Sequence, residues 1–129
     1  MSPADPSDLV SDCVQTLRLL QGRPTVRVVA AVETDVGTFK ACNVSVGECS
    51  HCSTCAEPAA IGAALAAGAT RFSRIVAVGW SRGEPVVLTP CGGCRELIQA
   101  IGIREVWVPT PDGVRPVAAE FLLPQVINP

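Results

Sequence analysis

Apolar residues recur at helical spacing near the start of the chain. Within residues 7–20 the apolar positions are Leu9, Val10, Cys13, Val14, Leu17 and Leu20. This spacing predicts an amphipathic helix with Ser7 as its N-cap. Two more helices are predicted over residues 55–68, which are rich in alanine, and over residues 91–101, and a glycine closes each of them.

Runs of β-branched and other apolar residues lie between these helices and predict strands. They cover residues 25–33, 38–44, 74–80, 86–88 and 105–108. The first two runs flank a short turn and predict a hairpin. Residues 45–54 have no periodicity and predict a loop, and residues 117–123 predict a short final helix.

The order of these elements indicates the fold class. Helices alternate with strands, with room for one more short strand after residue 108, which favours an α/β domain with helices on both faces of the sheet. The 129 residues fit a single domain, residues 1–129, without an internal repeat. Apolar residues make up 48% of the chain, which is enough to bury a core.

Charge and hydropathy narrow the possible partners. The net charge is −2 and the ten basic residues are scattered, so no patch predicts binding to nucleic acid. No apolar run is long enough to predict a membrane span, and the first residues do not resemble a secretory signal. We therefore expect a cytoplasmic protein with no nucleic-acid or membrane partner.

Seven cysteines are many for this length, and their clustering favours metal binding or catalysis over disulfides. Cys91-x-x-Cys94 lies where a strand is predicted to end and a helix to begin, with Thr89 as N-cap and Pro90 as first helical residue. Cys55 lies at a similar position before the alanine-rich helix. Two helix N-termini are thus expected to present three thiols at one end of the sheet.

Such an arrangement suits a catalytic zinc ion. A helix N-terminus favours the thiolate form of cysteine, and three thiolates leave the fourth position of Zn²⁺ open to a water that is nucleophilic near neutral pH. Glu57 follows Cys55 by two residues, a spacing that reaches this water. The alternative interpretation of Glu57 is a capping box formed with Thr54. The joint occurrence of both motifs at helix starts favours catalysis.

Two segments of the chain together resemble the zinc motifs of the cytidine deaminase superfamily, in particular of its small cytidine and blasticidin S deaminases. These segments are TCAEPAAIGAALAAG and TPCGGCRELI. The resemblance covers most of the chain from about residue 25, including EFLLP at 120–124. It implies a three-layer α-β-α fold with a mixed sheet of about five strands. It also implies a zinc-dependent hydrolase that acts on a cyclic amidine C–N bond and releases ammonia.

The resemblance assigns roles to individual residues. It implies that Zn²⁺ is bound by Cys55, Cys91 and Cys94. Glu57 would be the proton shuttle, Asn43 would bind the sugar, and the backbone at Ala56 would hold the base carbonyl. The expected substrate is a free cytosine nucleoside, either cytidine, deoxycytidine or an antibiotic such as blasticidin S. Enzymes of this kind are commonly homotetramers, and a homodimer is the other state considered.

Three features depart from the family pattern. Ser45 stands where cytidine deaminases usually carry an acidic sugar contact, and Glu48 in the same loop is the alternative carboxylate. Pro58 stands where Arg often follows the shuttle Glu, which leaves the helix dipoles and Arg95 to offset the thiolate charge. The usual aromatic residue before the first strand is absent. Stacking on the base would then use apolar contacts or one of Phe39, Phe72, Phe121, Trp80 and Trp107.

The loop at 45–54 leaves further alternatives open. Cys49 and Cys52 are interpreted either as a second metal site or redox pair, or as ordinary loop residues. His51, the only histidine, either approaches the pocket or is solvated. A fourth thiolate from Cys52 would indicate a zinc-stabilised module without catalysis. Within the same chemistry, another amino-heterocycle of purine or pterin type is the alternative substrate.

Overall fold

The computed structural model describes residues 5–48 and 52–121. The helices in this part of the chain are α1 (Ser7–Leu19), α2 (Ala56–Ala66) and α3 (Gly92–Ile101), followed by a short 3-10 helix at Ala119–Phe121. The strands are β1 (Val28–Thr34), β2 (Gly37–Cys42), β3 (Phe72–Ser81), β4 (Glu84–Leu88), β5 (Glu105–Thr110) and β6 (Gly113–Val117).

The strands form one mixed sheet in the order β2-β1-β3-β5-β6, with β4 paired to β3 as well. The pair β3–β5 is parallel, and the other pairs are antiparallel. β3 pairs with β5 near its start, at Arg74 and Ile75, and with β4 from Ala77 onward. This long strand therefore has room for two partners on one edge, and the sheet has six strands where about five were expected.

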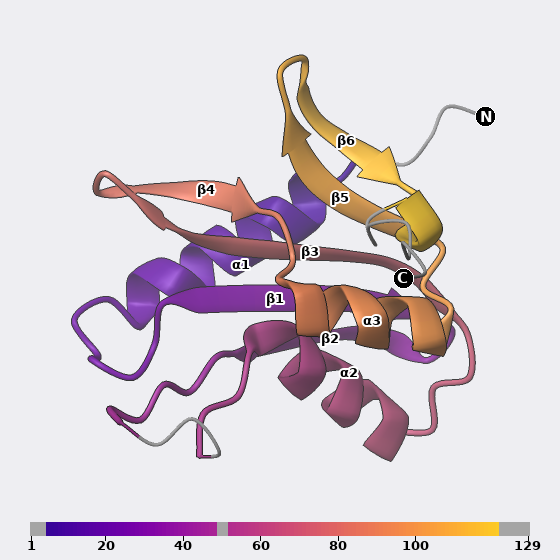
Figure 1. The fold of residues 1–129 in the computed structure, drawn as a ribbon, viewed down its shortest axis with the longest axis horizontal. Coiled ribbons are helices and arrows are strands. Elements are labelled where there is room, and N and C mark those ends of the chain that lie inside the picture. Colours follow the sequence, from indigo (N-terminus) through magenta and orange to yellow (C-terminus); the bar gives the residue numbers. More distant parts are fainter. Residues whose placement is uncertain (1–4, 49–51, 122–129) are drawn as a thin grey trace, which may run out of the picture.

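Helices cover both faces of the sheet, which confirms the expected three layers (Figure 1). Successive side chains of a strand point to opposite faces. In β1, Val29 and Ala31 pack with residues of α1, while Ala30 and Val32 pack with residues of α2 and α3. Each face thus has its own buried cluster.

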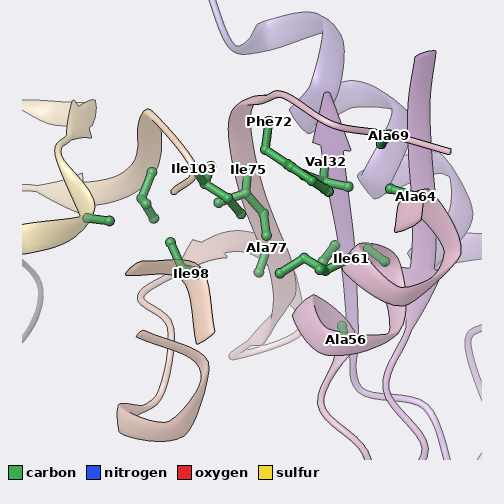
Figure 2. Packing of buried hydrophobic residues seen from close by; sticks show 14 of the residues in the cluster. Val32, Ala56, Ile61, Ala64, Ala69, Phe72, Ile75, Ala77, Ile98 and Ile103 are labelled. Carbon is green, nitrogen blue, oxygen red and sulfur yellow. The ribbon is translucent and has the colours of Figure 1, made fainter. Parts of the chain in front are cut away.

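The face under α2 and α3 holds the larger cluster. Figure 2 shows Ile61 of α2 and Ile98 of α3 on either side of Ile75 and Ala77 of β3. Both helical isoleucines are at most 1% exposed. Truncating such a residue to alanine costs about 2–5 kcal/mol, so these contacts fix both helices on the sheet.

Helix starts differ from the sequence prediction. The N-cap of α1 is Pro6, not Ser7. The N-cap of α3 is Cys91, not Thr89, because Cys91 is still extended at φ −70° and ψ 170° and the helix begins at Gly92. The predicted final helix at 117–123 is wrong at its start, since Val117 ends β6 and only a 3-10 turn follows. Residues 122 and 123 lie outside the described residues.

The start of α1 is tied to the sheet through a buried arginine. Arg74 is 5% exposed, and its guanidinium donates to both carboxylate oxygens of Glu33 at 3.0 and 2.9 Å. It also donates to Asp8 at 3.2 Å and to the backbone oxygen of Asp5 at 3.0 Å.

Across the described ranges, no helix has the length and apolar character needed to span a bilayer.

Candidate metal centre and cavity

Three cysteines meet where α2 and α3 begin. Cys55 is the N-cap of α2, Cys91 is the N-cap of α3, and Cys94 is the third residue of α3. Their sulfur atoms all lie within 4.8 Å of one another, and those of Cys55 and Cys91 are 4.0 Å apart. Tetrahedral Zn²⁺ with bonds of about 2.3 Å holds its sulfurs about 3.8 Å apart. Small side-chain shifts therefore bring these three thiols to zinc-binding distance.

Local backbone geometry explains why these sulfurs converge. Both N-cap residues are extended, with ψ 159° at Cys55 and 170° at Cys91, and the helix turns away from each of them. The two helices lie side by side on one face and begin at the same end (Figure 1). Since a helix N-terminus carries a partial positive charge, both helices favour anionic sulfur at this point.

The ionisation of the thiols is uneven. The backbone N–H of Cys94 lowers the pKa of Cys91, as a cap donor does for an anionic acceptor. Burial raises the pKa of Cys55 and, more strongly, the pKa of Cys94, which the nearby Glu57 carboxylate raises further. Three thiolates therefore need a cation among them. A divalent metal that prefers thiolate ligands, such as zinc, meets that need, because a thiol that coordinates the metal loses its proton.

Glu57 lies beside the thiols in a buried position. Glu57 is only 6% exposed, and its Oε1 is 3.8 Å from the Cys94 sulfur. Burial raises the pKa of its carboxyl group, which favours the protonated form. The capping-box interpretation is wrong, because Cys55 rather than Thr54 is the N-cap and Glu57 is then the second helical residue.

A cavity of about 590 Å³ opens next to the thiols. This volume is in the range of small-molecule sites. The sequence-predicted residues that line it are Cys55, Cys91, Glu57, Ala56, Asn43, Ser45 and Glu48. Cys94 is buried and does not line the cavity, but its sulfur lies with those of Cys55 and Cys91. The structure thus brings all eight predicted site residues to one place.

Asn43 has a fixed orientation at the cavity wall. Its Oδ1 accepts hydrogen bonds from the backbone N–H groups of Arg27 at 2.7 Å and Val28 at 2.9 Å. The carbonyl end of the amide is therefore held by the start of β1. The Nδ2 end is the part of the side chain that donates to a molecule in the cavity.

Sequence reasoning missed several wall residues. Thr54 pairs with Val44 through two backbone hydrogen bonds of 2.9 and 2.8 Å, and the Ser53 hydroxyl accepts from the Val46 N–H at 3.0 Å. These contacts hold the 43–48 segment against the start of α2. The apolar floor consists of Val28, Ala77 and Leu88. Among the described lining residues there is no aromatic side chain, so the apolar-contact alternative fits this cavity.

Cys52 does not extend the thiol cluster. It is disulfide-bonded, so the expectation that the clustered cysteines serve metal binding or catalysis and not disulfides is wrong for this residue. No fourth Cys, His, Asp or Glu joins the three-thiol group within residues 5–48 and 52–121. The open fourth position that a catalytic zinc requires is therefore retained. The remaining hypotheses on this loop concern Cys49 and His51, which lie outside the described residues.

Comparison with known families agrees with this geometry. Residues 5–110 match the model of the cytidine and deoxycytidylate deaminase zinc-binding region. The chain belongs to this family. It is a zinc-dependent hydrolytic deaminase of α/β fold, and the expectation of zinc as its cofactor is confirmed. No curated protein sequence matches this chain at a significant level.

Solved structures of this family share the fold over almost the whole chain. Cytidine deaminase from Burkholderia pseudomallei is 30% identical with a TM-score of 0.72, over 96% of this chain and 100% of that one. Cytidine deaminase from Mycobacterium tuberculosis is 27% identical with a TM-score of 0.73, over 98% of this chain and 99% of that one. The enzyme from Mycobacterium leprae, also 27% identical, has a TM-score of 0.72, over 95% and 100%.

Proposed function

We propose that this single-domain enzyme hydrolyses the bond between C4 and the amino group of a free cytosine nucleoside and releases ammonia. The observation that carries the proposal is the position of Glu57. Its buried carboxyl lines the cavity and lies 3.8 Å from the sulfur of Cys94, beside the other two thiols. A carboxyl group with a raised pKa accepts and returns a proton near neutral pH, as general acid–base catalysis requires.

In this proposal Cys55, Cys91 and Cys94 hold zinc, which supplies the Lewis acid that makes water nucleophilic near neutral pH. Glu57 takes one proton from the attacking water and gives it to N3 of the ring while the water oxygen bonds to C4. It then carries the second proton to the amino nitrogen at C4. The C4–N bond breaks, ammonia leaves, and C4 becomes the carbonyl carbon of a uracil nucleoside.

Residues around the cavity would orient the substrate. The Asn43 amide would donate to a sugar hydroxyl from the orientation that β1 imposes. The backbone at Ala56 would hold the base carbonyl, at the positive end of α2. Ser45 and Glu48 line the cavity near Asn43, and Glu48 would supply the carboxylate that accepts from the sugar.

The charge of the cavity favours a nucleoside over a nucleotide. Phosphate recognition relies on Arg or Lys side chains or on other strong donors. Among the described lining residues none is Lys or Arg, and two are carboxylates, Glu48 and Glu57. A phosphorylated substrate would meet repulsion there. Cytidine, deoxycytidine or a cytosine-nucleoside antibiotic such as blasticidin S fits better, and an amino-heterocycle of purine or pterin type is the second candidate.

The assembly we propose is a homotetramer, with a homodimer as the alternative. Light scattering on the eluting protein would distinguish the two, at about four or two times the 13.4 kDa of one chain.

Ammonia release from cytidine, deoxycytidine, deoxycytidylate, cytosine, blasticidin S and a panel of purines and pterins tests the substrate. We expect Glu57→Gln to lower kcat by about 10²–10⁴-fold at unchanged zinc content, because the proton shuttle is lost. Glu96→Gln, an exposed carboxylate on α3, is the matched control and should keep full activity. Deamination of deoxycytidylate in preference to cytidine would contradict the charge argument. Activity on a purine or pterin alone would move the assignment to the second candidate.

A further inference from the structure

The metal centre gathers more negative charge than zinc neutralises. Zn²⁺ with three thiolates has a net charge of −1, and an ionised Glu57 adds another negative charge beside it. Charges of one sign at these distances repel one another strongly in a partly buried site. The described cavity lining offers neither Lys nor Arg, so the backbone turns that carry the thiolates must hold them together against this repulsion.

Arg95 is the basic residue directly after Cys94, and its side chain is half-buried. Its Nε donates to the backbone oxygen of Pro90 at 2.8 Å. Its main-chain N–H donates to the backbone oxygen of Cys91 at 2.9 Å. Helical side chains lean toward the N-terminus of their helix, which places this guanidinium beside the first turn of α3.

Both acceptors belong to the segment that positions the Cys91 sulfur. Cys91 is extended, and the chain changes from strand exit to helix at this residue. A segment of this kind has few hydrogen bonds of its own. The main-chain bond from Arg95 to Cys91 is the first of the helix, and the Nε bond to Pro90 is the side-chain contact that fixes this turn, with Cys91 and Cys94 on either side of the two glycines.

We propose that Arg95 is a positioning residue of the zinc site. Its Nε–H donates to the Pro90 oxygen and so ties the residue before Cys91 to the first turn of α3. It does not line the cavity. The inference rests on the proposed role of Cys91 and Cys94 as zinc ligands.

Zinc release to a chromophoric chelator tests this role in the full-length zinc-loaded enzyme. Loss of a side chain that orients metal ligands typically costs about 10- to 100-fold in metal affinity or activity, and we expect Arg95→Ala to release zinc faster by that factor. Arg95→Lys keeps a long cationic side chain but lacks the Nε donor to Pro90, so it too should release zinc faster than the parent. Arg104→Ala, an exposed arginine after α3, is the control and should match the parent.

Steady-state kinetics on the zinc-saturated variants add a second readout. Because Arg95 lies outside the cavity, KM should stay within about twofold while kcat follows zinc occupancy. Parent-like zinc release by Arg95→Ala overturns the proposal. If that variant fails to fold by circular dichroism, Arg95→Lys decides, and a parent-like release rate overturns it equally. Failure of the parent enzyme itself to retain zinc would refute the proposed function instead.

Discussion

Gly79 is expected to control the width of the cavity floor. It lies in β3, where it pairs with Val28 of β1 and Val86 of β4. A Cβ at this position would lie 2.6 Å from Leu88 Cδ1 and 3.1 Å from the backbone oxygen of Arg27. Nonbonded carbon atoms prefer about 3.5–4.0 Å, so the methyl group of Gly79→Ala overlaps Leu88 by about 1 Å.

The two contacts respond differently to this overlap. Leu88 meets the methyl group with the end of its side chain and can rotate, whereas the Arg27 backbone is fixed by its bond to Asn43. Overpacking of this kind costs about 1–3 kcal/mol of stability. Because Leu88 lines the cavity, its rotation also alters substrate binding. A loss of about 1 kcal/mol in binding raises KM about fivefold. We expect kcat to change less, because Glu57 is not displaced.

Urea denaturation and steady-state deamination kinetics measure the two effects. The denaturation midpoint should fall at constant slope, which separates a stability change from a change in the unfolded state. Gly62→Ala is the matched control, since this exposed helical glycine has open space around its Cβ position. Alanine there should stabilise α2 by about 0.5–1 kcal/mol. Equal midpoints for both variants, or an unchanged KM for Gly79→Ala, would refute the steric reasoning.

Two further expectations concern the far end of the sheet. Arg74→Met should lower the free energy of unfolding by about 3 kcal/mol, because it leaves the partly buried Glu33 carboxylate without its bidentate partner. Lys40→Met, which breaks a more exposed ion pair, should cost at most about 1 kcal/mol in the same urea titration; equal losses would contradict the burial argument. The Thr70 hydroxyl, then the backbone N–H groups of Arg71 and Thr70, lower the pKa of Asp35 from 3.8 to about 2. The stability advantage of the parent over Asp35→Asn should therefore be full above about pH 5 and should disappear as the pH falls through 2; an advantage that persists at pH 2 would argue against this linkage.

The sequence predicted the elements well where one face of an element is buried. Apolar spacing identified α1 and the central strands because each buries residues at the period of its own geometry. The predicted caps of α1 and α3 were wrong. Thr89 and Pro90 have the intrinsic preferences of a helix start, yet the helix begins after Cys91, which is still extended. The local preference of two residues did not decide where the chain turns into α3.

The candidate site was predicted in its chemistry and missed in its walls. Motif spacing was enough to group the three thiols with Glu57, since each residue lies within three positions of a helix start. The floor residues Val28, Ala77 and Leu88 come from three different strands. Only the register of β1 with β3 and of β3 with β4 brings them together. Such register depends on contacts between distant segments, which spacing within one motif does not encode.

Pro58 occupies the position after Glu57 where related enzymes often carry an arginine, so this position of α2 supplies no cation to the zinc site. It is the third residue of α2. The N–H groups of a first helical turn have no partner within the helix, so a proline there removes no helical hydrogen bond. The helix therefore tolerates Pro58 at little cost, but this position then brings neither a cation nor an N–H group toward the thiols.

The starts of α2 and α3 consequently have different roles in the site. The first helical hydrogen bond of α2, from the Ala59 N–H to the Cys55 oxygen, is 3.4 Å long, while the equivalent bond of α3, from Arg95 to Cys91, is 2.9 Å. The α3 turn is the tighter of the two, and the Arg95 side chain adds a bond to Pro90 there. In our proposal α2 contributes the proton shuttle and one thiol, whereas α3 contributes two thiols and the arginine that fixes their turn. Changes at the start of α3 should for this reason affect zinc retention more than equivalent changes at the start of α2.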